Sequence, residues 1–156
     1  MKVTLVVVGR VKGPLAPAAA EFEARARRYW KLELVEVEAG APGRRTPPEV
    51  IAAEEERILV RLPDDAEVVA LTRGGEGMGS EELASWLGEL GLGGSAGPAF
   101  VVGGAFGLGE RVMARARRRL SLSRFTLPHE LARLVLVEQL YRAGTILRGE
   151  PYHKGR

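Results

Sequence analysis

Residues 99–109 have the sequence AFVVGGAFGLG, in which a short apolar run gives way to four glycines. Ala99–Val102 is apolar throughout and contains two β-branched valines, a pattern typical of a buried strand. Gly103–Gly109 then predicts a tight loop, and Glu110–Arg119 predicts a basic helix. A strand that leads through a glycine loop into a helix is typical of an α/β fold with parallel strands. In such folds, ligands bind at the carboxyl ends of the strands, where this loop lies.

The same alternation extends in both directions along the chain. Apolar runs predict further strands at residues 2–8 and 67–71, and the alternation of apolar and acidic residues predicts one at 32–38. Helices are predicted at about 17–31, 47–61, 80–88 and 128–147, whereas 120–127 fits either a fifth strand or a structured loop. The expected fold class is therefore α/β, a parallel sheet with helices on both faces. Because the glycine loops are too short to be linkers, we expect one domain spanning residues 1–156.

Charge is distributed unevenly along the 156 residues. Residues 1–100 carry 12 basic and 16 acidic side chains, whereas residues 101–156 carry 11 basic and 4 acidic ones. The last third therefore has a net charge of +7, as expected of a protein that binds phosphates, although a solvated basic helix face would have the same composition. The absence of cysteine excludes a disulfide scaffold, a thiol nucleophile and a cysteine-ligated metal centre.

Two glycine-rich segments, Arg73–Gly79 and Gly103–Gly109, follow predicted strands and favour a nucleotide-like ligand, although tight turns alone would also explain the glycines. Neither segment contains GxGxxG, and the chain has no P-loop, which disfavours NAD-type Rossmann enzymes and P-loop NTPases. His129 and His153 lie 24 residues apart with no neighbouring cysteine, so we expect no metal site. The absence of GxSxG makes a serine hydrolase equally unpromising.

Apolar segments also bear on location and assembly. The longest aliphatic runs are far shorter than the about 20 residues that span a bilayer, and the first residues do not form a signal peptide. We therefore expect a cytoplasmic protein with no membrane partner. The predicted last helix, 128–147, is apolar around much of its circumference. We expect it to form the interface of a homodimer, and burial within the monomer is the alternative.

Specific motifs in the last third resemble a known family. FVVGGAFGLG at 100–109, LSLSRFTLPHELAR at 120–133, EQLYRA at 138–143 and PYHK at 151–154 resemble the RlmH family of SPOUT methyltransferases. Members of this family methylate N3 of a pseudouridine in the large-subunit (23S) rRNA. The resemblance implies a SPOUT-type parallel sheet with a C-terminal trefoil knot, a site for S-adenosylmethionine and a homodimer.

The resemblance also implies which residues bind the cofactor. Carried over by motif, they are Leu71, Gly103, Leu122, Ser123, Arg124, Phe125, Thr126 and Leu127, with Gly104 and Gly107 as neighbours. Two positions differ from the common pattern: Gly109 stands where many relatives have serine, and Arg124 occupies a variable position. Because backbone groups are expected to form most of this site, neither difference removes it.

The implied reaction needs groups beside the acceptor base. Methyl transfer to N3 is an in-line displacement, and the imide nitrogen must lose its proton. His153 and His129 are candidate bases because an imidazole has an intrinsic pKa of about 6.5. Arg142 is a candidate for stabilising the oxyanion or holding a phosphate. The alternative for His129 is a packing or capping role at the start of the last helix.

Basic side chains of the last third are expected to hold RNA. They are Arg115, Arg117, Arg118, Arg119, Arg133, Arg142, Lys154 and Arg156. The resemblance implies that the substrate is the assembled 70S ribosome, with no role for DNA. Two alternatives stay open, which are a SPOUT enzyme for another RNA such as tRNA, and a ribosome-binding factor without enzymatic activity.

Overall fold

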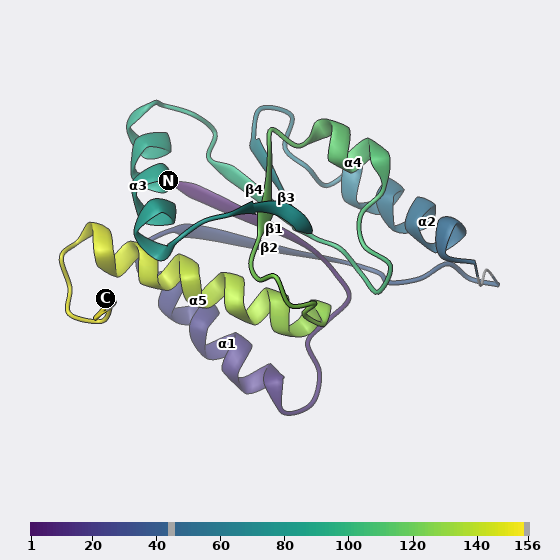
Figure 1. Ribbon diagram of the computed structural model, residues 1–156, viewed down its shortest axis with the longest axis horizontal. Coiled ribbons are helices and arrows are strands. Elements are labelled where there is room, and N and C mark those ends of the chain that lie inside the picture. The colour runs from purple at the N-terminus through teal and green to yellow at the C-terminus, as the bar shows by residue number, and fades with distance from the viewer. Residues whose placement is uncertain (44–45, 155–156) are drawn as a thin grey trace.

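The computed structural model describes residues 1–43 and 46–154, in which strands and helices alternate (Figure 1). The elements are β1 (Lys2–Val8), α1 (Leu15–Ala26), β2 (Lys31–Val37), α2 (Pro47–Leu59), β3 (Glu67–Gly77), α3 (Ser80–Leu92), β4 (Pro98–Val102), α4 (Glu110–Arg115), β5 (Arg118–Ser121) and α5 (His129–Leu147). All strand pairs are parallel, in the order β2-β1-β4-β3-β5. The predicted α/β fold class is therefore confirmed.

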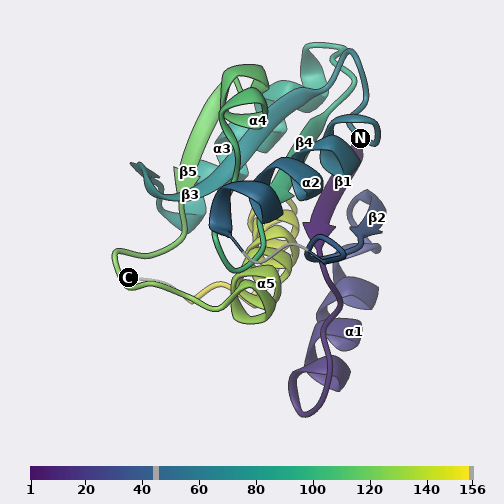
Figure 2. The ribbon, with the colours of Figure 1, turned by 90° about the vertical axis from the view of Figure 1, so that its right-hand side faces the viewer.

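Helices cover both faces of the sheet (Figures 1 and 2). Along β1, Leu5 and Val7 pack into a core shared with α1, α3 and α5, whereas Val6 and Val8 pack into a second core shared with α2 and α4. Successive side chains of a strand point to opposite faces, so a strand buried on both sides is apolar throughout. This explains why β1 and β4 were predictable from continuous apolar runs, whereas the edge strand β2 alternates apolar and charged residues.

Two predicted boundaries near the glycine loops are wrong. The strand predicted to end at Leu71 continues as β3 to Gly77, because its register on β5 shifts between Leu71 and Glu76 and pairing then resumes. The basic helix predicted to reach Arg119 ends at Arg115. Residues 118–121 instead form the edge strand β5, where the Leu120 side chain is buried. Of the two alternatives for 120–127, the structure has a strand to Ser121 followed by a loop.

Two helix ends also differ from prediction. Helix α1 stops at Ala26 rather than near Lys31, and Trp30 beyond it is buried with its indole N–H donating to the Leu140 carbonyl oxygen at 2.8 Å. Helix α3 continues to Leu92 rather than ending near Gly88. Packing against α5 carries this helix through Gly88, beside the Leu147 side chain. In both places tertiary contacts override the local sequence signal.

An ion-pair cluster connects α5 to the sheet and α1. The Arg133 side chain is only 8% exposed and donates to Glu23 at 2.9 Å and to Glu36 at 2.7 Å. Arg133 was predicted to contact RNA, and the structure corrects this prediction, because its guanidinium is already bound within the protein.

We expect Arg133→Ala to lower the free energy of unfolding by about 3 kcal/mol, because it leaves the buried Glu23 carboxylate without its cation. Urea unfolding at fixed protein concentration measures the change. Arg119→Ala, at an exposed arginine, is the control and should shift the free energy by less than about 0.5 kcal/mol. An unchanged midpoint for Arg133→Ala would show that the buried cluster does not stabilise the fold.

No helix within residues 1–43 and 46–154 is long and apolar enough to cross a membrane.

Candidate active site

A cavity of about 510 Å³ opens at the carboxyl end of β4 and beside the register shift in the middle of β3, and its size is within the range of small-molecule sites. Three segments form most of its wall: residues 71–73, the glycine loop 102–108 and the loop before α5. Seven of the eight predicted cofactor residues line it, namely Leu71, Gly103, Leu122, Ser123, Phe125, Thr126 and Leu127. Predicted neighbours Gly104 and Gly107 also line it. Arg124 does not line it, and its side chain is exposed.

Hydrogen bonds fix the loop between β5 and α5. Ser121 Oγ donates to the Ser123 carbonyl oxygen at 2.9 Å, and the Phe125 N–H donates to Ser123 Oγ at 2.9 Å. Arg73, from the far side of the cavity, donates to Thr126 Oγ1 at 2.5 Å. These bonds hold the backbone of the loop while leaving the Phe125 ring 84% exposed. The wall is thus largely preformed, with an apolar side chain at its rim.

His129 stands at the first position of α5 and lines the cavity. Its Nε2 lies 3.4 Å from the point that a Cβ on Gly9 would occupy, so the ring packs beside the end of β1. Gly9 has a φ of +82°, which turns the chain away there and leaves room for the imidazole. Among the described residues, no hydrogen bond to the His129 ring is found. The imidazole is therefore available to a ligand in the cavity.

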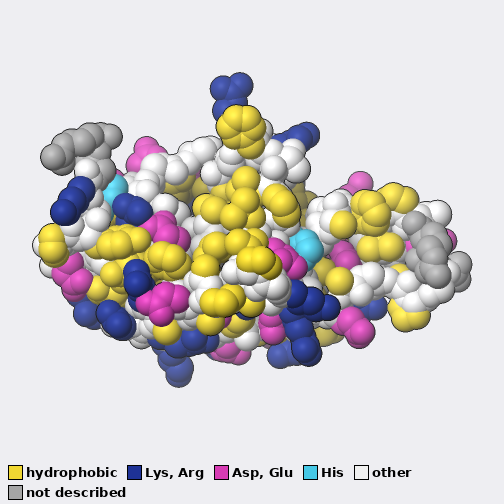
Figure 3. Space-filling model, turned by 90° about the horizontal axis from the view of Figure 1, so that it is seen from below, with side chains coloured by type: hydrophobic (Ala, Val, Ile, Leu, Met, Phe, Trp, Pro, Cys, Tyr) yellow, Lys and Arg dark blue, Asp and Glu magenta, His cyan; other side chains and the backbone are white. Residues whose placement is uncertain are grey.

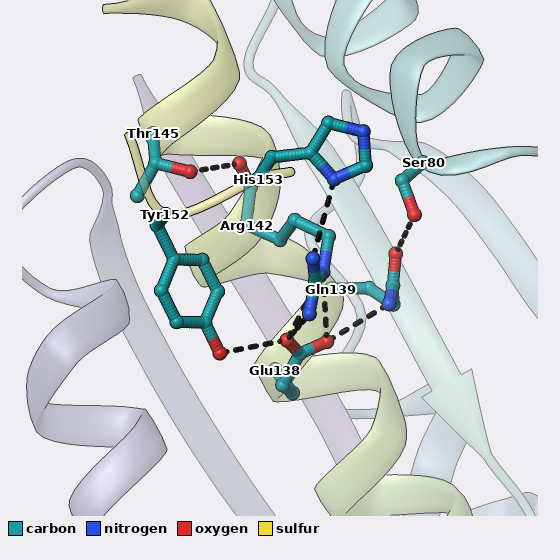
Figure 4. A network of polar contacts seen from close by, with 7 residues as sticks. All are labelled: Ser80, Glu138, Gln139, Arg142, Thr145, Tyr152 and His153. Atoms are coloured by element: carbon teal, nitrogen blue, oxygen red, sulfur yellow. Dashed lines mark hydrogen bonds and ion pairs between the residues drawn. The ribbon is translucent and has the colours of Figure 1, made fainter. Parts of the chain in front are cut away.

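A second polar cluster lies further along α5, around Glu138 at the middle of the helix (Figure 4). Arg142 donates to Glu138 Oε1 at 2.5 Å, Tyr152 Oη donates to the same oxygen at 3.0 Å, and Gln139 donates to Oε2 at 2.8 Å. His153 Nδ1 lies 3.2 Å from the Arg142 guanidinium. This cluster attaches the C-terminal segment to α5.

Electrostatics in this cluster follow from the shared carboxylate. The hydrogen bond to Glu138 raises the pKa of Arg142, so the guanidinium stays charged. Burial, followed by the hydrogen bond to Glu138, raises the pKa of the Tyr152 hydroxyl. The other ring nitrogen of His153 lies 3.6 Å from Glu81 on α3. His153 therefore lies between a cation and a carboxylate, with its side chain 16% exposed.

The three predicted catalytic residues do not meet within the single chain. His129 lies in the cavity, whereas Arg142 stands thirteen residues later on α5, about 20 Å away at 1.5 Å per residue. His153 accompanies Arg142 and does not line the cavity. Figure 3 shows the histidines as two separate patches on the face formed by α1 and α5, with hydrophobic side chains between them.

The predicted RNA contacts are only partly available. Arg115 donates to the carbonyl oxygens of Pro63 and Asp64, at 2.9 and 2.8 Å. Arg118 pairs with Glu76 at 2.6 Å, and Arg117 lies 3.9 Å from Glu67 at the amino end of β3.

Arg119 and Lys154 are exposed, Arg142 is paired with Glu138, and Arg156 lies outside the described residues. The arginines around β5 thus lie toward the start of the strand rather than at the cavity.

Sequence reasoning missed several residues around the cavity. Arg73, Phe106 and Met113 line it, and Arg10 and Lys12 are exposed directly after Gly9 beside His129. Arg73 was identifiable, because it follows the predicted third strand at the same edge of the sheet as Gly103. The other residues could not be identified from the sequence, because only the packing of distant loops brings them to the cavity.

Comparisons with known proteins agree with this arrangement. A family model described as predicted SPOUT methyltransferase matches residues 1–153. Two solved structures share the fold at low sequence identity. A probable methyltransferase from Bordetella pertussis has a TM-score of 0.55 at 19% identity, covering 92% of this chain and 94% of that one. A probable methylase family protein from Haemophilus influenzae has a TM-score of 0.52 at 15% identity, covering 98% of this chain and 70% of that one.

The chain belongs to the SPOUT methyltransferase family. Within it, the curated relatives are named ribosomal RNA large subunit methyltransferase H, which confirms the resemblance seen in the last third. The protein of that name from Gemmatimonas aurantiaca is 52% identical over 156 residues, covering 99% of this chain and all of the relative. Those from Rubrobacter xylanophilus and Listeria monocytogenes are 47% and 44% identical, and each covers at least 97% of this chain.

Proposed function

We propose that the protein is an S-adenosylmethionine-dependent methyltransferase that methylates N3 of a pseudouridine in 23S rRNA, on the assembled 70S ribosome in the cytoplasm. The main support is the cavity beside β3 and the end of β4, which seven residues carried over from the family motifs line together. The names of relatives up to 52% identical support large-subunit rRNA as the substrate. The C-terminal trefoil knot stays a prediction.

The cavity suits a donor with an adenosine moiety. Leu71, Leu122 and Leu127 supply apolar surface for an adenine ring, while Gly103 and Gly104 allow backbone groups to approach the ligand closely. A Cβ on Gly103 would lie 3.0 Å from the Gly107 carbonyl carbon, so the loop is already as tightly folded as glycine permits. The donor supplies an electrophilic methyl group on a sulfonium. The work of the chain is to hold that group in line with the acceptor nitrogen.

We propose that two protomers form a homodimer through α5 and share each site. Leu131, Leu134 and Val135 are only partly buried in the single chain, which leaves an apolar surface on this helix. In a two-fold dimer each contact occurs twice, so antiparallel α5 helices would bring the end of one helix beside the start of its partner. Such pairing would place Arg142 and His153 of one protomer beside His129 and the cavity of the other.

In this arrangement two imidazoles and one guanidinium would lie beside the acceptor base. His129, free of hydrogen bonds within the described chain, or His153 would take the N3 proton. Arg142, held charged by Glu138, would stabilise the negative charge that develops on the adjacent carbonyl oxygen. Binding of RNA phosphates by the exposed basic residues should weaken steeply with salt.

Transfer of labelled methyl from S-adenosylmethionine tests this function on three substrates: unmethylated 70S ribosomes, free large-subunit rRNA and bulk tRNA. We expect label on 70S particles alone, at N3 of a pseudouridine. Label on tRNA would instead establish the alternative RNA target. Ribosome binding without any transfer would establish a binding factor.

A further inference from the structure

Helix α2 carries a carboxylate on its core-facing stripe. Val50, Glu54 and Ile58 recur every four residues and are 9%, 3% and 1% exposed. A polar group at such a position costs free energy unless it has partners, and an ionised one costs more. Glu54 therefore stands where the helix pattern calls for an apolar side chain, and no contact described so far accounts for it.

Glu54 has a partner for only one of its two oxygens. Oε2 accepts the Gly40 N–H at 2.8 Å. Oε1 is buried and has no hydrogen-bond donor among the residues that the structure describes. Arg57, one turn further along α2, donates to the carbonyl oxygens of Glu38 and Gly40 at 2.7 and 2.6 Å rather than to this carboxylate.

The oxygen without a partner points at the glycine loop of the cavity. A Cβ on Gly104 would lie 2.8 Å from Glu54 Oε1 and 3.0 Å from Oε2. Gly104 itself lines the cavity. Because Gly104 has no side chain, only its backbone lies between the buried Glu54 carboxylate and the cavity.

Within the described chain, the cavity wall itself contains no carboxylate side chain. Its basic members are Arg73 and His129. A cationic ligand thus finds no counter-charge in the wall itself.

Two buried carboxylates lie behind the glycine loop: Glu54 at Gly104, and Glu55 at Gly109, where Glu55 accepts the Val112 N–H at 3.0 Å. Because Gly104 lines the cavity and Gly109 does not, Glu54 is the candidate counter-charge.

We infer that Glu54, acting across Gly104, is a positioning residue that selects the positively charged sulfonium donor over its neutral thioether product, an inference that rests on the proposed use of S-adenosylmethionine. The two ligands share the adenosine, the ammonium and the carboxylate groups, and they differ by one methyl group and one positive charge at sulfur. A buried carboxylate attracts that charge with little screening by solvent. Methyl transfer removes the charge, so the attraction ends with the reaction and the product is released more readily.

The test is a titration calorimetry comparison of S-adenosylmethionine and S-adenosylhomocysteine on the full-length protein. Glu54→Gln keeps an oxygen for the Gly40 N–H and removes the charge. We expect it to weaken binding of the donor about tenfold, while binding of the thioether changes less than about twofold. Glu56→Gln on the exposed side of the same helix is the matched control, and it should leave both affinities unchanged.

Equal weakening of both ligands by Glu54→Gln would show that Glu54 only supports the loop, and no weakening would show that it has no influence on the donor. Either result overturns the inference while leaving the proposed function intact. If the wild-type protein binds neither ligand, the proposed function fails, and the inference fails with it. If Glu54→Gln does not fold, Glu54→Met is titrated with the same two ligands, with the same expected ratio. This variant removes the charge and the oxygen without a partner, although it also removes the acceptor of the Gly40 N–H.

Discussion

Replacing Gly103 by valine should abolish binding of S-adenosylmethionine, with a loss of affinity of at least about 100-fold. Gly103 lies between β4 and the cavity, and a Cβ there would already stand 3.0 Å from both the Gly107 carbonyl carbon and Leu108 Cδ2. The two further methyl groups of valine would have to displace the loop, and overpacking of this kind costs about 1–3 kcal/mol. Because the loop is the cavity wall, the displacement would narrow the space for the ligand.

Calorimetry measures the affinity, and circular dichroism shows whether the variant is folded. Gly77→Val provides the control, since a Cβ on Gly77 meets nothing within 4 Å and this glycine lies in the paired part of β3. We expect the control to bind the donor as the wild-type protein does. Normal binding by a folded Gly103→Val protein would mean that the cofactor site lies elsewhere.

The position of the cavity was predictable because it depends on two features that are visible in the sequence. Apolar runs marked the strands, and glycines marked the points where Leu71 and Val102 reach the carboxyl edge of the sheet. Parallel strands end at the same edge, so Leu71 and Gly103 had to lie close together. The loop 122–127 was assigned to the cofactor site from the family resemblance alone, because its local sequence pattern fitted a strand as well as a loop.

Features that depend on partners distant in sequence were not predictable. The basic run 115–119 has the composition of a helix, yet pairing with β3 turns its second half into a strand. Arg133 is a basic residue of the kind that contacts RNA. In the fold, however, it is buried and bonded to Glu23, which lies 110 residues earlier in the chain. Glu54 was detectable in principle, since it interrupts an apolar stripe between Val50 and Ile58. What it faces depends on Gly104, and only the fold brings the two residues together.

Deleting residues 152–156 should abolish methyl transfer, with a fall in kcat of at least about 100-fold, while the proposed dimer and the affinity for S-adenosylmethionine stay unchanged. The deletion removes Tyr152 and His153 from the cluster around Glu138, but the bond between Arg142 and Glu138 remains within α5. No residue from 152 to 154 lines the cavity of its own protomer, so the affinity for the donor should change less than about twofold. A loss confined to kcat is typical of groups that act on the transition state.

Two point variants separate the contributions of the removed side chains. His153→Ala should account for most of the loss, because it removes the imidazole beside Arg142. Tyr152→Phe keeps the ring, whose centroid lies 4.5 Å from that of Tyr141, and removes only the hydrogen bond to Glu138, so its effect should be smaller. Size-exclusion chromatography with light scattering checks the dimer, and calorimetry checks the donor. Full activity of the truncated protein would exclude the C-terminal segment from the reaction. The protein would then have to act with His129 as the one histidine at the cavity.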